Sequence, residues 1–328
     1  MKTAIIGINL DFIEYLTIEN KFVQDNDRRE KAIRKLESVY SKDISILKND
    51  YEQKLKESFA EKYMELLSII AKEIVEAKVE FAVFPEYTLP QSFLHPLLNQ
   101  LQEIEENACF VLGTHLDRDN FNVSPIVFLN KSENTKKIYY QYKNYLSRIE
   151  NAIGSAKRSG YGILKFHNVG SCKYNFEVLI CSDAFCNIQP IIGDIDFVAL
   201  PCFNPSAMFI GHVQDELKLF KRIKGELKKY NVIGLYSNTI NEGDLCSQYL
   251  VEDLCRVPPL DTTKTHSPSA IKEGATENDS QAIEMVPTEN KMFKGITYRI
   301  QFAKIDVKKL RKLRFSTKSR WEKKDELS

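Results

Sequence analysis

Two patterns of apolar and polar positions occur along this chain: short, continuous apolar runs and longer segments with helical periodicity. The first run, residues 3–10 (TAIIGINL), is rich in β-branched side chains and predicts a buried strand. From about 26 to 78 the sequence is charged, with apolar side chains at helical spacing in its second half: Leu55, Phe59, Tyr63, Leu66, Leu67, Ile70 and Ile74. We interpret this half as a helix with one buried face. The earlier part, 26–48, predicts an additional helical segment.

Strands and helices alternate over the rest of the chain. Apolar runs predict strands at 79–84, 108–113, 163–168, 176–181, 196–203 and 231–238, and helical patterns lie near 93–105 and at 212–229. Residues 124–130 and 136–143 predict an antiparallel pair joined by the turn-like KSEN. Alternating strands and helices favour the α/β class, and the hairpin indicates mixed sheets.

The segment 258–282 interrupts this alternation. It contains no aromatic residue and is rich in Thr, Ser and Pro, so it cannot bury enough apolar surface to offset the entropy of ordering. We predict a disordered insertion at 256–292. Because 295–315 returns to a strand and a basic helix, residues 1–328 are predicted to form a single domain.

Composition narrows the class of protein. The chain has 328 residues, is 43% hydrophobic and carries a net charge of +1, which gives no electrostatic reason to expect a nucleic acid or an anionic membrane as partner. No stretch approaches the roughly 18–20 apolar residues that span a bilayer. The seven cysteines are odd in number and lie mostly in apolar contexts, as is typical of reduced thiols. We therefore expect a cytoplasmic protein.

The candidate chemistry lies where predicted strands stop. Glu86 follows the strand in FAVFPEY, Lys143 ends the hairpin arm YYQYK, and Cys181 ends the run VLICSD. In α/β proteins strand ends converge on one edge of the sheet, where reactive groups are held on rigid backbone. A carboxylate can take a proton from a thiol, and an ammonium group can stabilise the thiolate and an oxyanion.

Each residue alone has a structural interpretation. Glu86 could cap the next helix, Lys143 could be solvated, and Cys181 could be a small core residue. A zinc site from Cys181, Cys186, Cys202 and His212 is conceivable, but the chain has no C-x-x-C pair. The joint placement at three strand ends favours catalysis.

The motifs FPE with Glu86, YKNYL with Lys143 and ICSDAF with Cys181 resemble the three signature motifs of the nitrilase superfamily, the carbon–nitrogen hydrolases, in the family's order. The resemblance covers most of the chain apart from 26–48 and 250–292. It implies an α-β-β-α sandwich that hydrolyses a non-peptide C–N bond through a cysteine thioester. No metal or organic cofactor is implied.

The resemblance also implies roles for individual residues. Glu86 would be the general base, Lys143 the oxyanion stabiliser and Cys181 the nucleophile. The backbone N–H of Ser182 would help to hold the oxyanion, and Asp183 would anchor the turn. Many family members have a second Glu between the Lys and the Cys, for which Glu150 is the best candidate; the other Glu in that interval, Glu177, lies inside a predicted strand.

The sequence departs from the family after the nucleophile. Phe185 comes one place early, and Cys186 stands near the position of the family's Pro, so a rigid turn is lost. This favours a rival hypothesis, a non-catalytic nitrilase-like domain that binds a ligand or a partner, although all three motif residues are present. Acyl transfer to an amine is a third reading. The expected partners are a small amide, ureido or nitrile substrate and, as is common in the family, a second copy of the chain in a homodimer or larger homo-oligomer.

Overall fold

The computed structural model describes residues 1–10, 51–146, 150, 162–170, 173–183, 195–203, 233–237, 249–251, 283–286, 289–309 and 311. The helical segments predicted at 26–48 and 212–229 lie outside these residues, as do Cys186 and His212 of the zinc alternative. Within the described ranges, no three His, Cys, Asp or Glu side chains are placed to hold a metal ion.

Nine of the described strands form one mixed sheet. Its central strands β1, β2 and β3 are parallel, and the remaining pairs are antiparallel. The order is β12-β14-β1-β2-β3-β5-β4, with β13 paired to β14 and β6 paired to β5. The strands are β1 (Lys2–Ile8), β2 (Phe81–Val83), β3 (Ala108–Val111), β4 (His115–Leu116), β5 (Asn122–Asn130), β6 (Thr135–Tyr142), β12 (Ile283–Met285), β13 (Lys291–Phe293) and β14 (Ile296–Ile305).

Five further strands form a second sheet in the order β11-β10-β9-β8-β7. Strands β8, β9 and β10 are parallel, and the two outer strands pair antiparallel with their neighbours. The strands are β7 (Lys165–Val169), β8 (Tyr174–Val178), β9 (Phe197–Pro201), β10 (Ile233–Ser237) and β11 (Tyr249–Val251).

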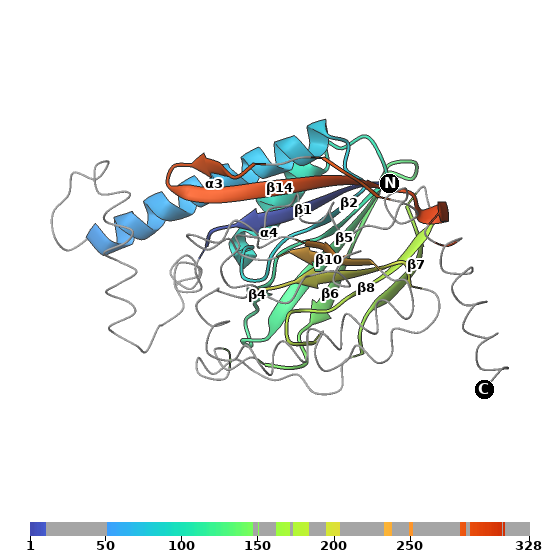
Figure 1. Ribbon diagram of the computed structural model, residues 1–328. Coiled ribbons are helices and arrows are strands. Elements are labelled where there is room, and N and C mark those ends of the chain that lie inside the picture. The colour runs from blue at the N-terminus through green and yellow to red at the C-terminus, as the bar shows by residue number, and fades with distance from the viewer. Residues whose placement is uncertain are drawn as a thin grey trace, which may run out of the picture.

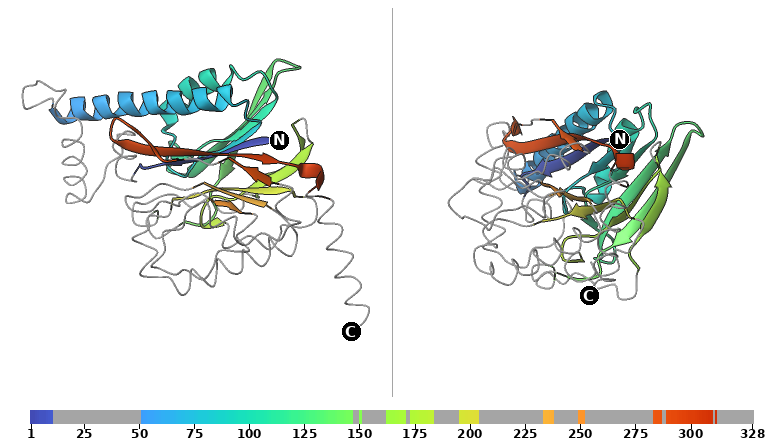
Figure 2. Two further views of the ribbon diagram at one scale, coloured as in Figure 1. Left: turned by 45° about the horizontal axis from the view of Figure 1, so that its top comes forward. Right: turned by 45° about the vertical axis from the view of Figure 1, so that its right-hand side comes forward.

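The described elements form three layers (Figures 1 and 2). The helices α3 (Tyr51–Glu76) and α4 (Leu94–Leu101) cover one face of the nine-stranded sheet, and the five-stranded sheet packs on its other face. One apolar core lies between the helices and the first sheet. A second core lies between the sheets and is rich in aromatic rings, with Phe81 of β2 against Tyr174 and Phe176 of β8. The mixed α/β class predicted from the sequence is thus confirmed.

Helix α3 shows why the periodic pattern was informative. Apart from Leu55, whose side chain is outside the described set, all residues of the predicted apolar face are buried. The helix also contacts a turn that follows β2, where the Tyr63 hydroxyl donates a hydrogen bond to the Thr88 carbonyl oxygen at 2.6 Å. In the part of the chain that the structure describes, no helix has the length and apolarity needed to cross a membrane.

The structure corrects two boundaries. Strand β12 and the first two residues of β13 lie within 256–292, the segment predicted as a disordered insertion, because residues 283–285 and 291–293 pair with β14. Residues 256–282 lie outside the described part. Strand β8 ends at Val178, three residues before the expected end at Cys181. Main-chain pairing with the β9 segment nevertheless continues, from Leu179 N to Ala199 O at 3.0 Å and from Cys181 N to Pro201 O at 2.9 Å.

Candidate active site

Glu86 lies in a tight turn directly after β2. The Thr88 hydroxyl donates to the Pro85 carbonyl oxygen at 2.6 Å, and Tyr87 has a left-handed backbone with φ 55°. The loop after β3 packs closely on this turn, because a Cβ on Gly113 would lie only 2.5 Å from the Pro85 carbonyl oxygen. The turn also hydrogen-bonds to the other sheet, from Glu86 N to Cys202 O at 3.2 Å. The Glu86 carboxylate is therefore held on rigid backbone.

Lys143 follows β6 and lies beside the first residue of β5. Its backbone N–H donates to the Asn122 carbonyl oxygen at 2.9 Å. The antiparallel register of the hairpin places its N-terminal start and its C-terminal end side by side. This pairing brings the Asn122 amide and the Lys143 ammonium to the same place, and both side chains are buried.

Cys181 lies in a turn that follows β8 and still pairs with the end of β9. Its φ is +46°, a left-handed conformation that is uncommon for a residue with a Cβ and recurs at functional sites. The next two residues join this turn to the loop after Lys143. The Asp183 carboxylate accepts hydrogen bonds from Asn144 N at 3.0 Å and Tyr145 N at 2.8 Å, and the Ser182 hydroxyl donates to the Tyr145 carbonyl oxygen. The Cys181 turn and the Lys143 loop are thus fixed relative to each other.

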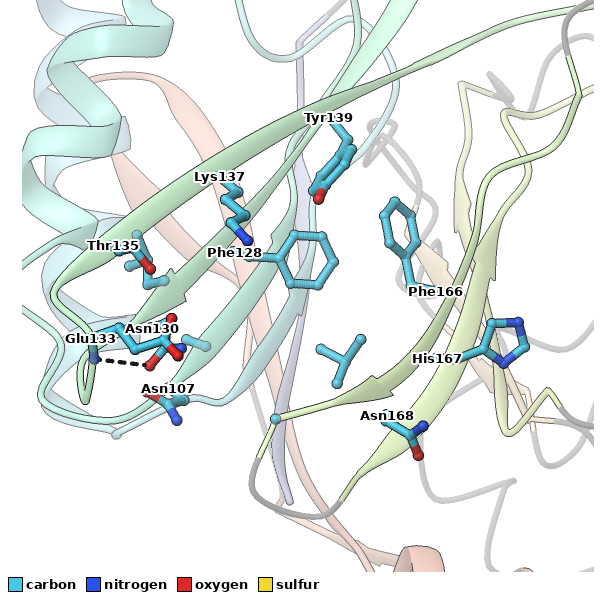
Figure 3. A pocket seen from close by; sticks show the side chains of 14 residues that line it. Asn107, Phe128, Asn130, Glu133, Thr135, Lys137, Tyr139, Phe166, His167 and Asn168 are labelled. Atoms are coloured by element: carbon cyan, nitrogen blue, oxygen red, sulfur yellow. Dashed lines mark hydrogen bonds between the residues drawn. The ribbon is translucent and has the colours of Figure 1, made fainter.

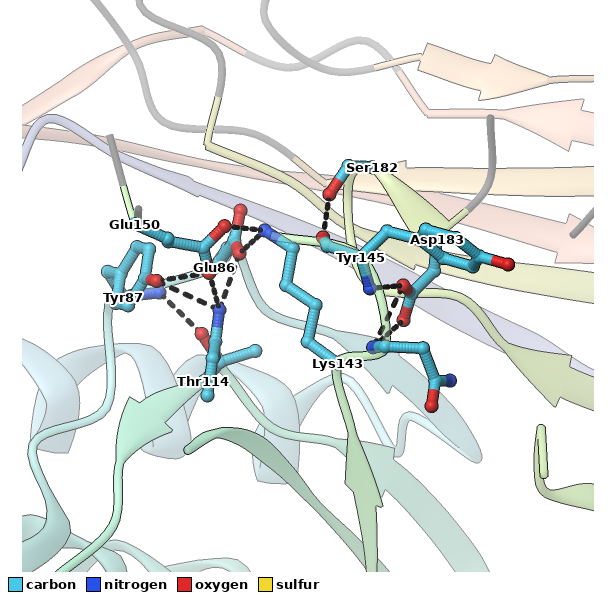
Figure 4. A network of polar contacts seen from close by, with 10 residues as sticks. Glu86, Tyr87, Thr114, Lys143, Tyr145, Glu150, Ser182 and Asp183 are labelled. Atoms are coloured by element: carbon cyan, nitrogen blue, oxygen red, sulfur yellow. Dashed lines mark hydrogen bonds and ion pairs between the residues drawn. The ribbon is translucent and has the colours of Figure 1, made fainter. Parts of the chain in front are cut away.

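A buried polar network surrounds the Lys143 ammonium (Figure 4). Lys143 Nζ lies 2.6 Å from Glu86 Oε1 and 2.7 Å from Glu150 Oε2. Asn122 Nδ2 joins the two carboxylates, donating to Glu86 Oε1 at 2.7 Å and to Glu150 Oε1 at 2.8 Å. The Tyr87 hydroxyl donates to the same Glu150 oxygen at 2.6 Å. Glu150 thus accepts from three donors, and such a set stabilises a charged carboxylate.

Burial and neighbouring charges act in opposite directions on Glu86 and on Lys143. Burial raises the pKa of Glu86 well above its usual value, and the nearby Lys143 offsets only part of this. For Lys143 burial acts in the opposite direction, but the charges of Glu86, Cys181 and Glu150 outweigh it and raise the lysine pKa. Lys143 is therefore charged and pairs with the Glu150 carboxylate. Glu86, which shares that cation, is then the carboxyl group poised to accept a proton.

Cys181 titrates in the opposite direction from an ordinary buried thiol. A hydrogen bond from the Cys202 thiol and the nearby Lys143 ammonium lower the pKa of Cys181 to about 6, against the effect of its own burial. In contrast, burial raises the pKa of Cys202 well above its usual value, and so does the hydrogen bond with Cys181. At neutral pH the pair therefore holds a thiolate at Cys181 and a protonated thiol at Cys202.

Of the residues proposed from the sequence, Glu86, Lys143 and Glu150 are in direct contact, and Cys181 lies within electrostatic reach of all three. Glu177, the other Glu of that interval, lies apart in β8 with Lys165 at 3.8 Å. Burial raises the Glu177 pKa to about 7. Two members of the network, Tyr87 and Asn122, are not distinguished by any pattern in the sequence. Tyr87 follows Glu86 directly and Asn122 lies two residues before the predicted strand 124–130, but neither position alone distinguishes a network member from a core residue.

The Tyr87 hydroxyl offers a test of this network. We expect Tyr87→Phe to lower the free energy of unfolding by about 1–2 kcal/mol, because Glu150 loses one buried hydrogen bond. Urea denaturation followed by circular dichroism measures the change. Tyr139→Phe is the matched control, since that side chain is 42% exposed, and it is expected to be neutral. Equal stability of both variants would show that the Tyr87 hydroxyl contributes nothing to holding Glu150.

A separate cavity of about 390 Å³ lies between the β5–β6 hairpin and β7 (Figure 3). Phe128 of β5, Tyr139 of β6 and Phe166 of β7 line it and contact one another, with the ring centroids of Phe128 and Tyr139 at 5.0 and 5.4 Å from that of Phe166. None of the proposed catalytic residues lines this cavity. It is distinct from the Glu86–Lys143 network.

Comparison with known proteins gives likenesses in structure only. No family model matches the chain, and no curated protein matches it. Among solved structures, it is similar to an amidase from Nesterenkonia sp., with 10% sequence identity and a TM-score of 0.37, over 55% of this chain and 70% of that one. A variant of that amidase, from Nesterenkonia sp. AN1, carries the acetamide moiety of fluoroacetamide covalently at its active-site cysteine, with the same identity, TM-score and coverage. Another variant, in complex with butyramide, matches at 11% identity, with a TM-score of 0.37 and the same coverage of both chains.

Proposed function

We propose that this protein is a thiol-dependent hydrolase of a non-peptide C–N bond, of the amidase type, with nitrilase or carbamoylase chemistry as its variants. One observation carries the proposal: a buried lysine contacts two carboxylates and lies beside a cysteine whose pKa is lowered to about 6. Burying four ionisable groups costs stability unless they are paired, and groups with strongly shifted pKa values cluster at functional sites.

In the proposed reaction Cys181 starts as the thiolate, and Glu86, the carboxyl whose pKa burial raises, carries the proton. The thiolate attacks the carbonyl carbon, and the C=O electron pair moves onto oxygen. Lys143 and the Ser182 backbone N–H stabilise this oxyanion. When the carbonyl re-forms, the C–N bond breaks and Glu86 gives its proton to the departing ammonia or amine. Water, deprotonated by Glu86, then releases the acid from the thioester.

The remaining residues act on these groups. Glu150 and Asn122 position the Lys143 ammonium and the Glu86 carboxylate, and Asp183 holds the turn that carries the nucleophile. We propose further that the fold is the four-layer α-β-β-α sandwich, of which the described elements form three layers. A cytoplasmic location and assembly into a homodimer or larger homo-oligomer are part of the same proposal.

The test is a screen of small amides, ureido acids and nitriles for ammonia release by the purified chain. The proposal predicts release from at least one amide, together with a transient mass adduct of the acyl group on Cys181. If no compound of any of the three classes is turned over and none forms an adduct, the non-catalytic binding hypothesis replaces the enzyme.

The pKa of Cys181 makes a prediction that needs no substrate. Its alkylation rate with iodoacetamide should rise through about pH 6 and level off by about pH 7.5, because only the thiolate reacts. Peptide mapping after short pulses at each pH measures the profile. The control is the chain unfolded in urea, in which the same cysteine should titrate at about pH 8.5. A native profile that coincides with the unfolded one would contradict the thiolate assignment.

A further inference from the structure

Cys181 and Cys202 occupy facing positions on neighbouring segments of the five-stranded sheet. The parallel register of β8 and β9 pairs Val178 with Ala199. Continuing this register by three residues pairs Cys181 with Cys202. The hydrogen bond from Cys181 N to Pro201 O at 2.9 Å shows that the pairing does continue to this point.

The two thiols are close enough to react with each other. Paired strands lie about 4.8 Å apart, and the Cα separations of disulfides run from about 4.4 to 6.8 Å. The side chains also face one another, since the two thiols share a hydrogen bond. Neither cysteine is in a disulfide, and both are buried.

Both backbone polar groups of Cys202 are hydrogen-bonded. Its N–H donates to the Ser237 carbonyl oxygen at 2.7 Å, and its carbonyl oxygen accepts from Glu86 N at 3.2 Å. The Ser237 hydroxyl in turn donates to the Ile6 carbonyl oxygen at 2.5 Å. The second thiol is therefore fixed beside the first.

We propose that Cys181 and Cys202 form a modification site for hydroperoxides, at which oxidation closes a reversible disulfide between the two side chains. In the first step the Cys181 thiolate attacks a peroxide oxygen, the O–O bond breaks, and the leaving hydroxide or alkoxide takes a proton. Cys181 is now a sulfenic acid. In the second step the Cys202 sulfur attacks this sulfur, the S–O bond breaks, and the Cys202 proton leaves with the hydroxide as water. The peroxide gains two electrons and the two thiols lose two.

The two thiols differ in protonation at neutral pH, and this difference sets the order of the two steps. The thiolate is the nucleophile toward peroxides, and Cys181 is the thiol with the lowered pKa. Cys202 remains protonated and available as the second thiol. A thiol beside a sulfenic acid prevents further, irreversible oxidation to the sulfinic and sulfonic acids. The site would thus protect a reactive cysteine from permanent loss.

The consequence for activity rests on the proposed function. A disulfide at Cys181 removes the nucleophile, so hydrolysis should stop and return after reduction. The disulfide itself depends only on the placement of the two thiols. It is measured by mass, so its absence and the absence of hydrolysis are separate results.

The experiment treats the full-length, reduced chain with hydrogen peroxide at neutral pH, blocks the remaining thiols with iodoacetamide and digests with trypsin and an Asp-specific protease. Residues 174–182, 183–193 and 196–214 then fall into separate peptides, because Lys173, Asp183, Asp194, Asp196 and Asp215 delimit them. These peptides separate Cys181, Cys186 and Cys202. We expect a cross-link between 174–182 and 196–214, complete loss of alkylation at both cysteines, and full recovery with dithiothreitol.

Variants decide which thiol is the partner. In Cys202→Ser, whose hydroxyl can still donate to the Cys181 thiolate, Cys181 should instead progress to the sulfinic and sulfonic acids and should no longer be recovered by dithiothreitol, whereas Cys186→Ser should behave as the unmodified chain does. Cys109, buried in β3, is the internal reference and should stay reduced. A cross-link from Cys181 to Cys186, or equal over-oxidation with and without Cys202, would overturn the proposal.

Discussion

Replacing Cys181 by alanine is expected to lower the rate of ammonia release by at least about a thousandfold, because removal of a covalent nucleophile leaves only residual catalysis by the surrounding groups. The site contains a thiolate and two carboxylates, and the sulfur is the nucleophile proposed to form the acyl intermediate. The measurement is turnover of whichever amide the screen identifies, together with intact mass. The acyl adduct of the unmodified chain should be absent from the variant.

Cys109→Ala provides the matched control. Cys109 is fully buried between the two sheets, where burial raises its pKa, so its thiol is an inert core group. We expect this variant to keep its turnover within about twofold of the unmodified chain while it loses a small amount of stability. Turnover retained in Cys181→Ala would assign the reaction to another nucleophile and remove the basis of the proposed function.

The second large effect is expected on stability. Lys143→Met should lower the free energy of unfolding by about 3–5 kcal/mol, because it leaves Glu86 and Glu150 buried without their shared cation. Urea denaturation measures this loss. Lys72→Met is the control: Lys72 lies 3.8 Å from Glu76 with both side chains largely exposed, and such pairs contribute at most about 0.5 kcal/mol.

The pH dependence of Lys143→Met identifies the cause of the loss. Without the lysine, the pKa of the buried Glu86 carboxyl should lie further above its value in the unfolded chain, because the cation that offsets part of the burial effect is gone. A folded state that binds more protons than the unfolded state gains stability as the pH falls. The deficit relative to the unmodified chain should therefore be smaller at pH 5 than at pH 8. A deficit independent of pH would indicate lost packing instead of an uncompensated charge.

A double variant separates the roles of the two carboxylates. Adding Glu150→Gln to Lys143→Met should recover part of the stability, because one of the two unpaired acids becomes neutral while keeping an oxygen that can accept from Tyr87 and Asn122. It should not restore turnover, since the oxyanion still lacks the ammonium group. Recovery of turnover would show that the lysine acts only by holding the carboxylates in place.

Local patterns in the sequence determined several parts of the fold. The 3.6-residue spacing of the apolar side chains predicts the buried face of α3, since that spacing places them on one side of any helix. The β5–β6 hairpin follows equally from two apolar runs around a turn. The positions of Glu86 and Lys143 after strands could be read in the same way. These features depend on residues close together in the chain.

Only the tertiary structure decided which strand ends meet. Asn122 and Tyr87 become part of the site because the hairpin brings Asn122 beside Lys143 and the turn after β2 directs Tyr87 toward Glu150. Cys202 becomes the partner of Cys181 through the register of two parallel strands. No local pattern specifies such contacts, because they depend on how sheets pair and pack across large separations in sequence. The same packing buries Glu86, which raises the pKa of its carboxyl, and brings Cys202 and Lys143 close to Cys181, which lowers the pKa of that thiol against the effect of its own burial.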